Sequence, residues 1–190
     1  MPIKKAYIIH GWEGNSQGGF LPWLKKELEN KGYQVSAPDM PDPNTPQISA
    51  WVGKMQELIG APDENTILIG HSLGGLAILL YLQSLPPQNR VGQAVLVASV
   101  IEDIKDLSPE GALIINSWLE QGKNLDADKI KQACPQINAF FSDDDPFIPL
   151  SSEQIAREQL GAITVIEHQK GHFNQETNIY EVPEIIKIII

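Results

Sequence analysis

The chain has a single cysteine and no long apolar run. Because Cys134 has no second cysteine to pair with, an internal disulfide is excluded, and nothing in the sequence requires an oxidising compartment. No apolar stretch reaches the roughly 20 residues that a membrane-spanning helix needs. Residues 1–6 lead directly into a strand-like run, without the apolar core of a signal peptide. We therefore expect an intracellular, cytoplasmic protein that binds no membrane.

Basic residues are scarce. There are 14 Lys and Arg against 24 Asp and Glu, which gives a formal net charge of −10. Nucleic acids and anionic lipids are repelled by such a balance, so neither is expected as a partner. The hydrophobic fraction of 42% is ordinary for a folded chain, and 190 residues are enough for one domain with a substantial core. We expect one domain over residues 1–190.

Short apolar runs alternate with helical patterns along the chain. Continuous apolar strands that alternate with helices are typical of a parallel sheet covered on both faces. Residues 102–135 interrupt the alternation and predict one or two short helices outside the core. A short closing helix is expected within 182–190. The pattern thus predicts an α/β fold whose parallel sheet has about six strands, at 6–10, 33–37, 66–70, 93–100, 137–142 and 162–168.

The strongest chemical signal is Gly-His-Ser-Leu-Gly-Gly at 70–75. It lies between a predicted strand and a predicted helix, which is the context of the G-x-S-x-G nucleophile elbow. Its glycines permit a strained turn that raises Ser72 above the sheet. The N–H of Leu73 and the helix dipole then face any oxyanion that forms. The same letters also occur in ordinary glycine loops, but the strand–turn–helix context favours the elbow.

A serine needs a base, and the chain has four histidines. His10 ends the first predicted strand, and the side chain of His71 should point away from that of Ser72. His172 follows the last predicted strand in a glycine-preceded loop, at the sheet edge where catalytic loops gather. It is the predicted general base. His168, at the end of that strand, is the alternative, with His172 then structural.

Three consecutive aspartates, at 143–145, follow the fifth predicted strand. They could form a solvated loop or a weak cation site, but no calcium-loop spacing is present, and we predict no metal and no cofactor. Asp145 is the favoured orienting acid because Pro146 stiffens the loop behind it and a D-x-x-I-P pattern begins there. The order Ser72, Asp145, His172 is the one expected of α/β-hydrolases.

The loop at 10–14, His-Gly-Trp-Glu-Gly, is expected to supply the second oxyanion donor, the backbone N–H of Trp12. The alternative, a phosphate loop, lacks both the Lys-Ser/Thr ending and the G-x-G-x-x-G spacing. Aromatic residues near the predicted catalytic elements form a candidate substrate pocket, unless they only pack the core. Besides Trp12 they are Trp118, Phe147 and Phe173.

Together these pieces resemble the small, lidless α/β-hydrolases of the family typified by bacterial YdeN and the retinoblastoma-binding protein nine serine hydrolases. The resemblance implies a compact three-layer sandwich without a substantial lid. It also implies a triad of Ser72, Asp145 and His172. The matching segments are 7–12, 22–24, 70–75, 145–149 and 171–173.

The expected function is therefore that of a serine hydrolase, a carboxylesterase that cleaves a small-molecule ester through an acyl-enzyme. With no large lid, the pocket should be open and suit short acyl chains. A thioesterase or an aminopeptidase would use the same triad. A non-catalytic interaction module on a hydrolase fold is the alternative from another class, because fold alone does not establish activity. The sequence does not identify a protein partner.

Overall fold

Six parallel strands form one sheet in the order β2-β1-β3-β4-β5-β6 in the computed structural model, which describes residues 2–189. The prediction of a parallel sheet of about six strands is confirmed. The strands are β1 (Lys5–Ile9), β2 (Gln34–Ser36), β3 (Thr66–His71), β4 (Gln93–Val97), β5 (Ile137–Ser142) and β6 (Ile163–Glu167).

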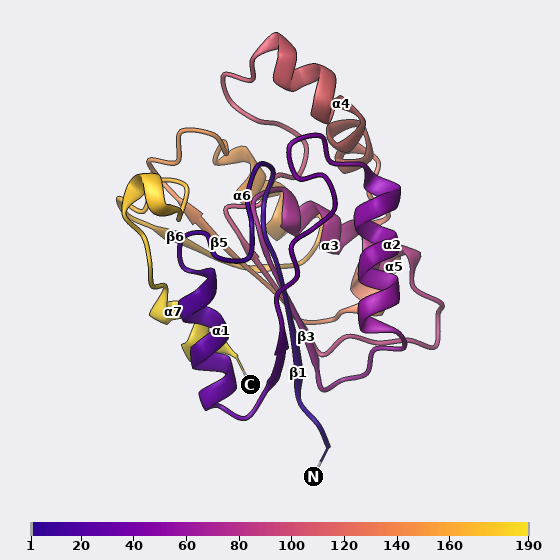
Figure 1. Ribbon diagram of the computed structural model, residues 1–190. Coiled ribbons are helices and arrows are strands. Elements are labelled where there is room, and N and C mark those ends of the chain that lie inside the picture. Colours follow the sequence, from indigo (N-terminus) through magenta and orange to yellow (C-terminus); the bar gives the residue numbers. More distant parts are fainter. Residues whose placement is uncertain (1, 190) are drawn as a thin grey trace.

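The central strands are apolar on both faces because helices cover both faces. Every residue of β4 and β5 is buried, whereas the edge strand β6 is partly exposed. Figure 1 shows α1 and α7 on one side of the sheet and α2, α3 and α5 on the other. The bounds are α1 (Leu21–Asn30), α2 (Ile48–Ile59), α3 (Leu73–Ser84), α5 (Ala127–Ala133) and α7 (Pro183–Ile188).

Two further elements lie near the end of the chain. The helix α6 (Ser151–Glu158) packs against β5 and β6, and the short 3-10 helix η1 (Gln175–Thr177) follows the last strand. The closing helix expected within 182–190 is present as α7, while residue 190 lies outside the described part of the chain. Within residues 2–189, none of the helices combines the length and apolar character needed to cross a bilayer.

The segment between β4 and β5 differs from expectation. It contains the 15-residue helix α4 (Pro109–Lys123) as well as α5, and α4 contributes to the core. The side chains of Ile115 and Trp118 are fully buried. Trp118 Nε1 donates to the Pro46 carbonyl at 2.9 Å, and its ring meets that of Trp51 edge-on at 5.4 Å. The expectation of helices outside the core was wrong, because α4 packs on α3 and its Trp118 also contacts Trp51 of α2.

Strand β4 is shorter than predicted, ending at Val97 rather than near 100. Ala98 has a positive φ of 45°, which breaks the extended backbone. The chain then turns toward the elbow, where the Val100 N–H donates to the Ser72 carbonyl at 3.2 Å. The end of β4 is thus shaped to support the turn after β3.

Sheet topology determines where a site can form. Strand β1 lies between β2 and β3, so the chain leaves β1 toward one edge of the sheet and leaves β3 toward the other. Loops diverge at the carboxyl ends of such strands and leave a crevice between them. The loops after β1 and β3, which carry two predicted site segments, therefore flank this switch point. Figure 1 shows α4 near the same end of the sheet, far from the N-terminus.

Candidate active site

Ser72 occupies a strained turn between β3 and α3. Its backbone has φ 54° and ψ −122°, which a residue with a side chain rarely adopts. Glycines make the turn possible, because a Cβ on Gly70 would lie 2.6 Å from the Gly75 nitrogen and one on Gly74 would lie 2.3 Å from the Ile9 carbonyl oxygen. The geometry is that of a nucleophile elbow at the amino end of a buried helix.

A buried acid–histidine pair lies at the same end of the sheet. The Nδ1 of His172 is 2.9 Å from one Asp145 carboxylate oxygen and 3.2 Å from the other. Asp145 is only 2% exposed and also accepts the backbone N–H groups of Phe147 and Ile148, at 2.8 and 3.0 Å. Because a carboxylate only accepts, Nδ1 carries the proton and Nε2 keeps its lone pair. The predicted contact between Asp145 and His172 is present.

Ser72 and His172 line one cavity of about 430 Å³. Within residues 2–189, no hydrogen bond joins the Ser72 hydroxyl to the His172 ring. Serine–histidine bonds in free enzymes are often long and tighten only when substrate binds. The arrangement is therefore compatible with proton transfer from Ser72 to His172.

The other two aspartates hold the loop that carries His172. Asp143 faces the His168 ring at 2.6 Å and accepts the Gln169 N–H at 3.1 Å. Asp144 accepts the Gly171 N–H at 2.8 Å. The pKa of Asp143 is lowered, mainly by the His168 bond, and the pKa of Asp144 is lowered, mainly by the Ser142 hydroxyl that donates to it at 2.7 Å and then by the Gly171 N–H. All three aspartates thus bind successive parts of one loop, and their carboxylates do not converge as a cation site would require.

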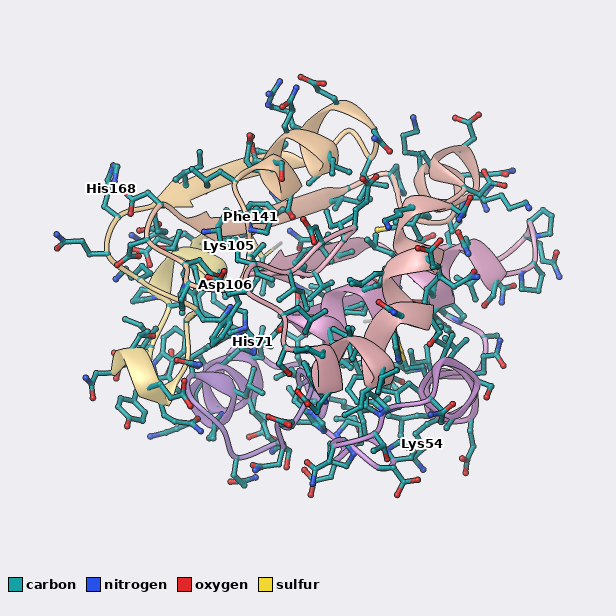
Figure 2. All side chains as sticks on the ribbon, turned by 90° about the horizontal axis from the view of Figure 1, so that it is seen from above. Lys54, His71, Lys105, Asp106, Phe141 and His168 are labelled. Atoms are coloured by element: carbon teal, nitrogen blue, oxygen red, sulfur yellow. The ribbon has the colours of Figure 1, made fainter. Side chains whose placement is uncertain are left out.

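His168 is not placed to act as the base. Its side chain is 84% exposed and Figure 2 shows it at the rim of the molecule, well away from His71 at the elbow. The hydrogen bond that His168 donates to Asp143 raises the pKa of His168. His168 therefore belongs to the support of the loop, and the alternative that made it the general base was wrong.

The loop after β1 lies directly against the nucleophile. A Cβ on Gly11 would be 2.8 Å from the Ser72 Cβ and 3.3 Å from its hydroxyl oxygen, so only glycine allows this approach. Within residues 2–189, the backbone N–H groups of Trp12 and Leu73 donate to no protein acceptor. Both are thus available to a ligand atom at the serine.

His10 anchors that loop from inside. Its Nδ1 lies 2.8 Å from the Gly11 carbonyl, and its Nε2 accepts the Met40 N–H at 2.8 Å. The ring must therefore be neutral, with the proton on Nδ1. Burial is the main reason why the pKa of His10 is lowered, which agrees with this assignment. His10 is structural and is not a candidate base.

The cavity wall is partly as predicted. Trp12, Phe147 and Phe173 line it, together with Ile104 and other residues of the segment before α4. Trp118 does not, so its assignment to the pocket was wrong. Its indole is fully buried, where the ring packs against Trp51 of α2 and the N–H donates to the Pro46 carbonyl.

Two residues that the sequence did not identify also meet this site. The Lys105 ammonium donates to the Asp145 carbonyl at 2.6 Å, and its backbone N–H donates to the Phe147 carbonyl at 2.7 Å. These bonds connect the segment before α4 to the loop at 143–149, called the acid loop because it carries Asp145. His71 lies within hydrogen-bond distance of the His172 carbonyl, at 2.8 Å. No local pattern identifies either partner, because both contacts join segments that are distant in the chain.

The chain is similar in sequence to known hydrolases along nearly its whole length. The profile of the family described as serine hydrolase matches residues 6–190. The chain is 32% identical over 190 residues to Serine hydrolase RBBP9 of Rattus norvegicus, covering 98% of this chain and 95% of that protein. It is 29% identical over 187 residues to YdeN of Bacillus subtilis (strain 168), covering 98% and 94%.

Solved structures agree with these relatives. The crystal structure of the ydeN gene product matches with a TM-score of 0.86 at 28% identity, over 97% of this chain and 96% of that one. The carboxylesterase CesB from Bacillus subtilis matches with a TM-score of 0.62 at 16% identity, over 97% and 81%. The latter likeness concerns the fold alone.

Proposed function

This chain belongs to the serine hydrolase family and has the α/β-hydrolase fold without a large lid, and we propose that it cleaves a small carboxylic ester through an acyl-enzyme on Ser72. One observation carries the proposal. His172, held by the buried Asp145, lines the same cavity as the partly buried Ser72 in its strained elbow. A nucleophile, a base and an orienting acid are the parts that acyl transfer requires.

The first half-reaction forms the acyl-enzyme. The Ser72 oxygen attacks the ester carbonyl carbon while His172 Nε2 takes the hydroxyl proton. Asp145 holds the resulting imidazolium by the Nδ1 hydrogen bond. The N–H groups of Trp12 and Leu73 stabilise the negative charge on the carbonyl oxygen. When the carbon–oxygen bond of the ester breaks, the leaving alkoxide takes the proton from His172 and departs as the alcohol.

The second half-reaction releases the acid. Water enters the cavity, His172 takes its proton, and the oxygen attacks the acyl carbon. The Ser72 oxygen then leaves and recovers a proton from His172, which restores the free enzyme. The cavity of about 430 Å³ lies toward the small end of the range for ligand sites, roughly 300–1,000 Å³. Its size supports a short acyl chain.

A fluorophosphonate probe and a p-nitrophenyl ester series test this proposal. The wild-type protein should be labelled at Ser72 and should hydrolyse short-chain esters faster than long-chain ones. The Ser72→Ala variant should do neither, with an unchanged melting temperature. A folded wild-type protein that resists the probe would rule out an activated serine and favour a non-catalytic module. Faster cleavage of matched acyl thioesters or aminoacyl amides would instead reassign the substrate class.

A further inference from the structure

The residue before the nucleophile touches the base. The His71 Nε2 lies 2.8 Å from the main-chain carbonyl of His172, a residue 101 positions away. A carbonyl oxygen only accepts, so the His71 Nε2 carries the proton and donates it. Within residues 2–189, this is the one side-chain hydrogen bond between the elbow at 70–75 and the loop at 168–173.

Ring packing adds to that bond. The imidazoles of His71 and His172 lie 4.9 Å apart between centroids, tilted by 51°. His71 also meets the ring of Phe20, the residue before α1, edge-on at 5.7 Å. The His71 ring thus contacts both Phe20 and the base, and it lines the cavity. In Figure 2, seen from above, His71 lies toward the middle of the view and His168 at its rim.

The His71 ring stays neutral while its neighbour changes charge. Burial, followed by the repulsion of a charged His172, lowers the pKa of His71 to about 3. Asp145 opposes this shift, and His10 adds to it. His71 therefore keeps a fixed tautomer and does not compete for the proton that His172 takes.

The loop around the base needs such support. Gly171 and Phe173 on either side of His172 both have positive φ, of 50° and 51°. Aspartates of the acid loop hold this loop from the β5 side, but they do not connect it to the nucleophile. The side-chain hydrogen bond of His71 adds a direct contact from the elbow to this loop.

We propose that His71 is a positioning residue that couples the nucleophile elbow to the backbone of the general base, so that Ser72 and His172 keep one relative geometry. The inference rests on the proposed function in one respect, namely that these two residues exchange a proton. Its structural part, the order of the His172 ring, does not depend on activity.

Three variants of His71 test separately the hydrogen-bond donor, the length of the side chain and the shape of the ring. The His71→Gln side chain can place an amide N–H near the position of Nε2, whereas His71→Asn carries the same group but is too short. The His71→Phe side chain keeps the ring and loses the donor. We expect His71→Gln to retain kcat within about threefold, with KM unchanged. We expect His71→Asn and His71→Phe to lose about 10- to 100-fold in kcat, the scale of a misplaced catalytic group.

A second readout needs no substrate. The Nδ1 proton of His172, shared with Asp145, should give a low-field NMR resonance in the wild type and in His71→Gln. That resonance should broaden in His71→Asn and His71→Phe. The exposed Glu57→Ala variant in α2, outside both segments, is the control and should keep it.

Each result bears on one claim. Wild-type kcat and a sharp resonance in His71→Phe and His71→Asn would overturn the positioning role and leave the proposed hydrolase intact. An inactive wild type would overturn the proposed function, and the NMR comparison would still decide whether His71 orders the base. If His71→Phe does not fold, the pair of amide variants, which differ by one methylene, carries the test.

Discussion

The elbow and the histidine loop both carry a catalytic residue of the proposed triad, but different forces shape them. Elbow residues 70–75 are held by backbone contact, because a Cβ on Gly74 would lie 2.3 Å from one main-chain oxygen and 2.5 Å from the next. The loop at 168–173 is held by hydrogen bonds to three carboxylates. Steric contact is all or none, whereas hydrogen bonds are lost one at a time. The fold of the elbow should therefore fail abruptly on a single substitution, whereas the three carboxylates of the histidine loop should contribute separately and unequally.

The largest effect is expected at Asp145, which is hydrogen-bonded to His172. In Asp145→Asn the amide would place a donor against His172 Nδ1, which favours the wrong tautomer of the base. We expect kcat to fall by about 10³- to 10⁴-fold. Ester hydrolysis under saturating substrate measures this loss, and circular dichroism checks the fold. A loss below about tenfold would show that the pair does not orient the base.

The next largest effect is expected at Gly74, where close backbone contact shapes the elbow. In Gly74→Ala the new methyl would meet the Ile9 and His10 carbonyl oxygens, which cannot move without disturbing β1. We expect unfolding free energy to fall by about 3 kcal/mol. Urea unfolding measures it. Gly53→Ala in α2 is the matched control, because a Cβ there has nothing within 4 Å. It should gain roughly 0.5–1 kcal/mol from helix propensity. Equal effects would contradict the steric account.

A graded loss is expected at Asp144. The Asp144→Ala variant removes the acceptor of the Gly171 N–H but leaves the Asp145–His172 contact in place. We expect kcat to fall between about 3- and 30-fold, below the roughly 100-fold loss that a 1 Å misplacement causes. Steady-state kinetics should show little change in KM. A loss as large as that of Asp145→Asn would mean that the loop behaves as one rigid unit.

The smallest effect is expected at the exposed Asp143–His168 pair. The pKa of His168 is raised, so its contribution to stability is present below its ordinary value of about 6.5 and is lost as pH rises through the folded value. The pKa of Asp143 is lowered, so its contribution is lost at the acid end, below about pH 4. His168→Ala should therefore lower the melting temperature slightly near about pH 5.5 and not near about pH 8.5. Added salt should weaken the difference. An equal decrease at both pH values would exclude the ion pair as its cause.

The comparison also explains which parts of the molecule were predictable. Strain at the elbow is encoded within six residues, so the turn at Ser72 could be predicted from them. The alternation of apolar runs and helical patterns likewise predicted the parallel sheet, because burial on both faces leaves a local pattern in each strand. Predictions were wrong where the local sequence carries no information about the contact. Trp118 was expected in the pocket, yet it packs on α2.

The sequence by itself determined the fold class, the elbow, and the order of the three predicted catalytic residues, since each depends on neighbours in the chain. Tertiary structure alone decided what Asp143 and Asp144 bind, why His168 cannot reach the site, and how Lys105 and His71 meet the acid and base loops. Those contacts join segments tens of residues apart. Their partners are selected by the closure of the sheet and the packing of its loops, and no short stretch of sequence records that choice.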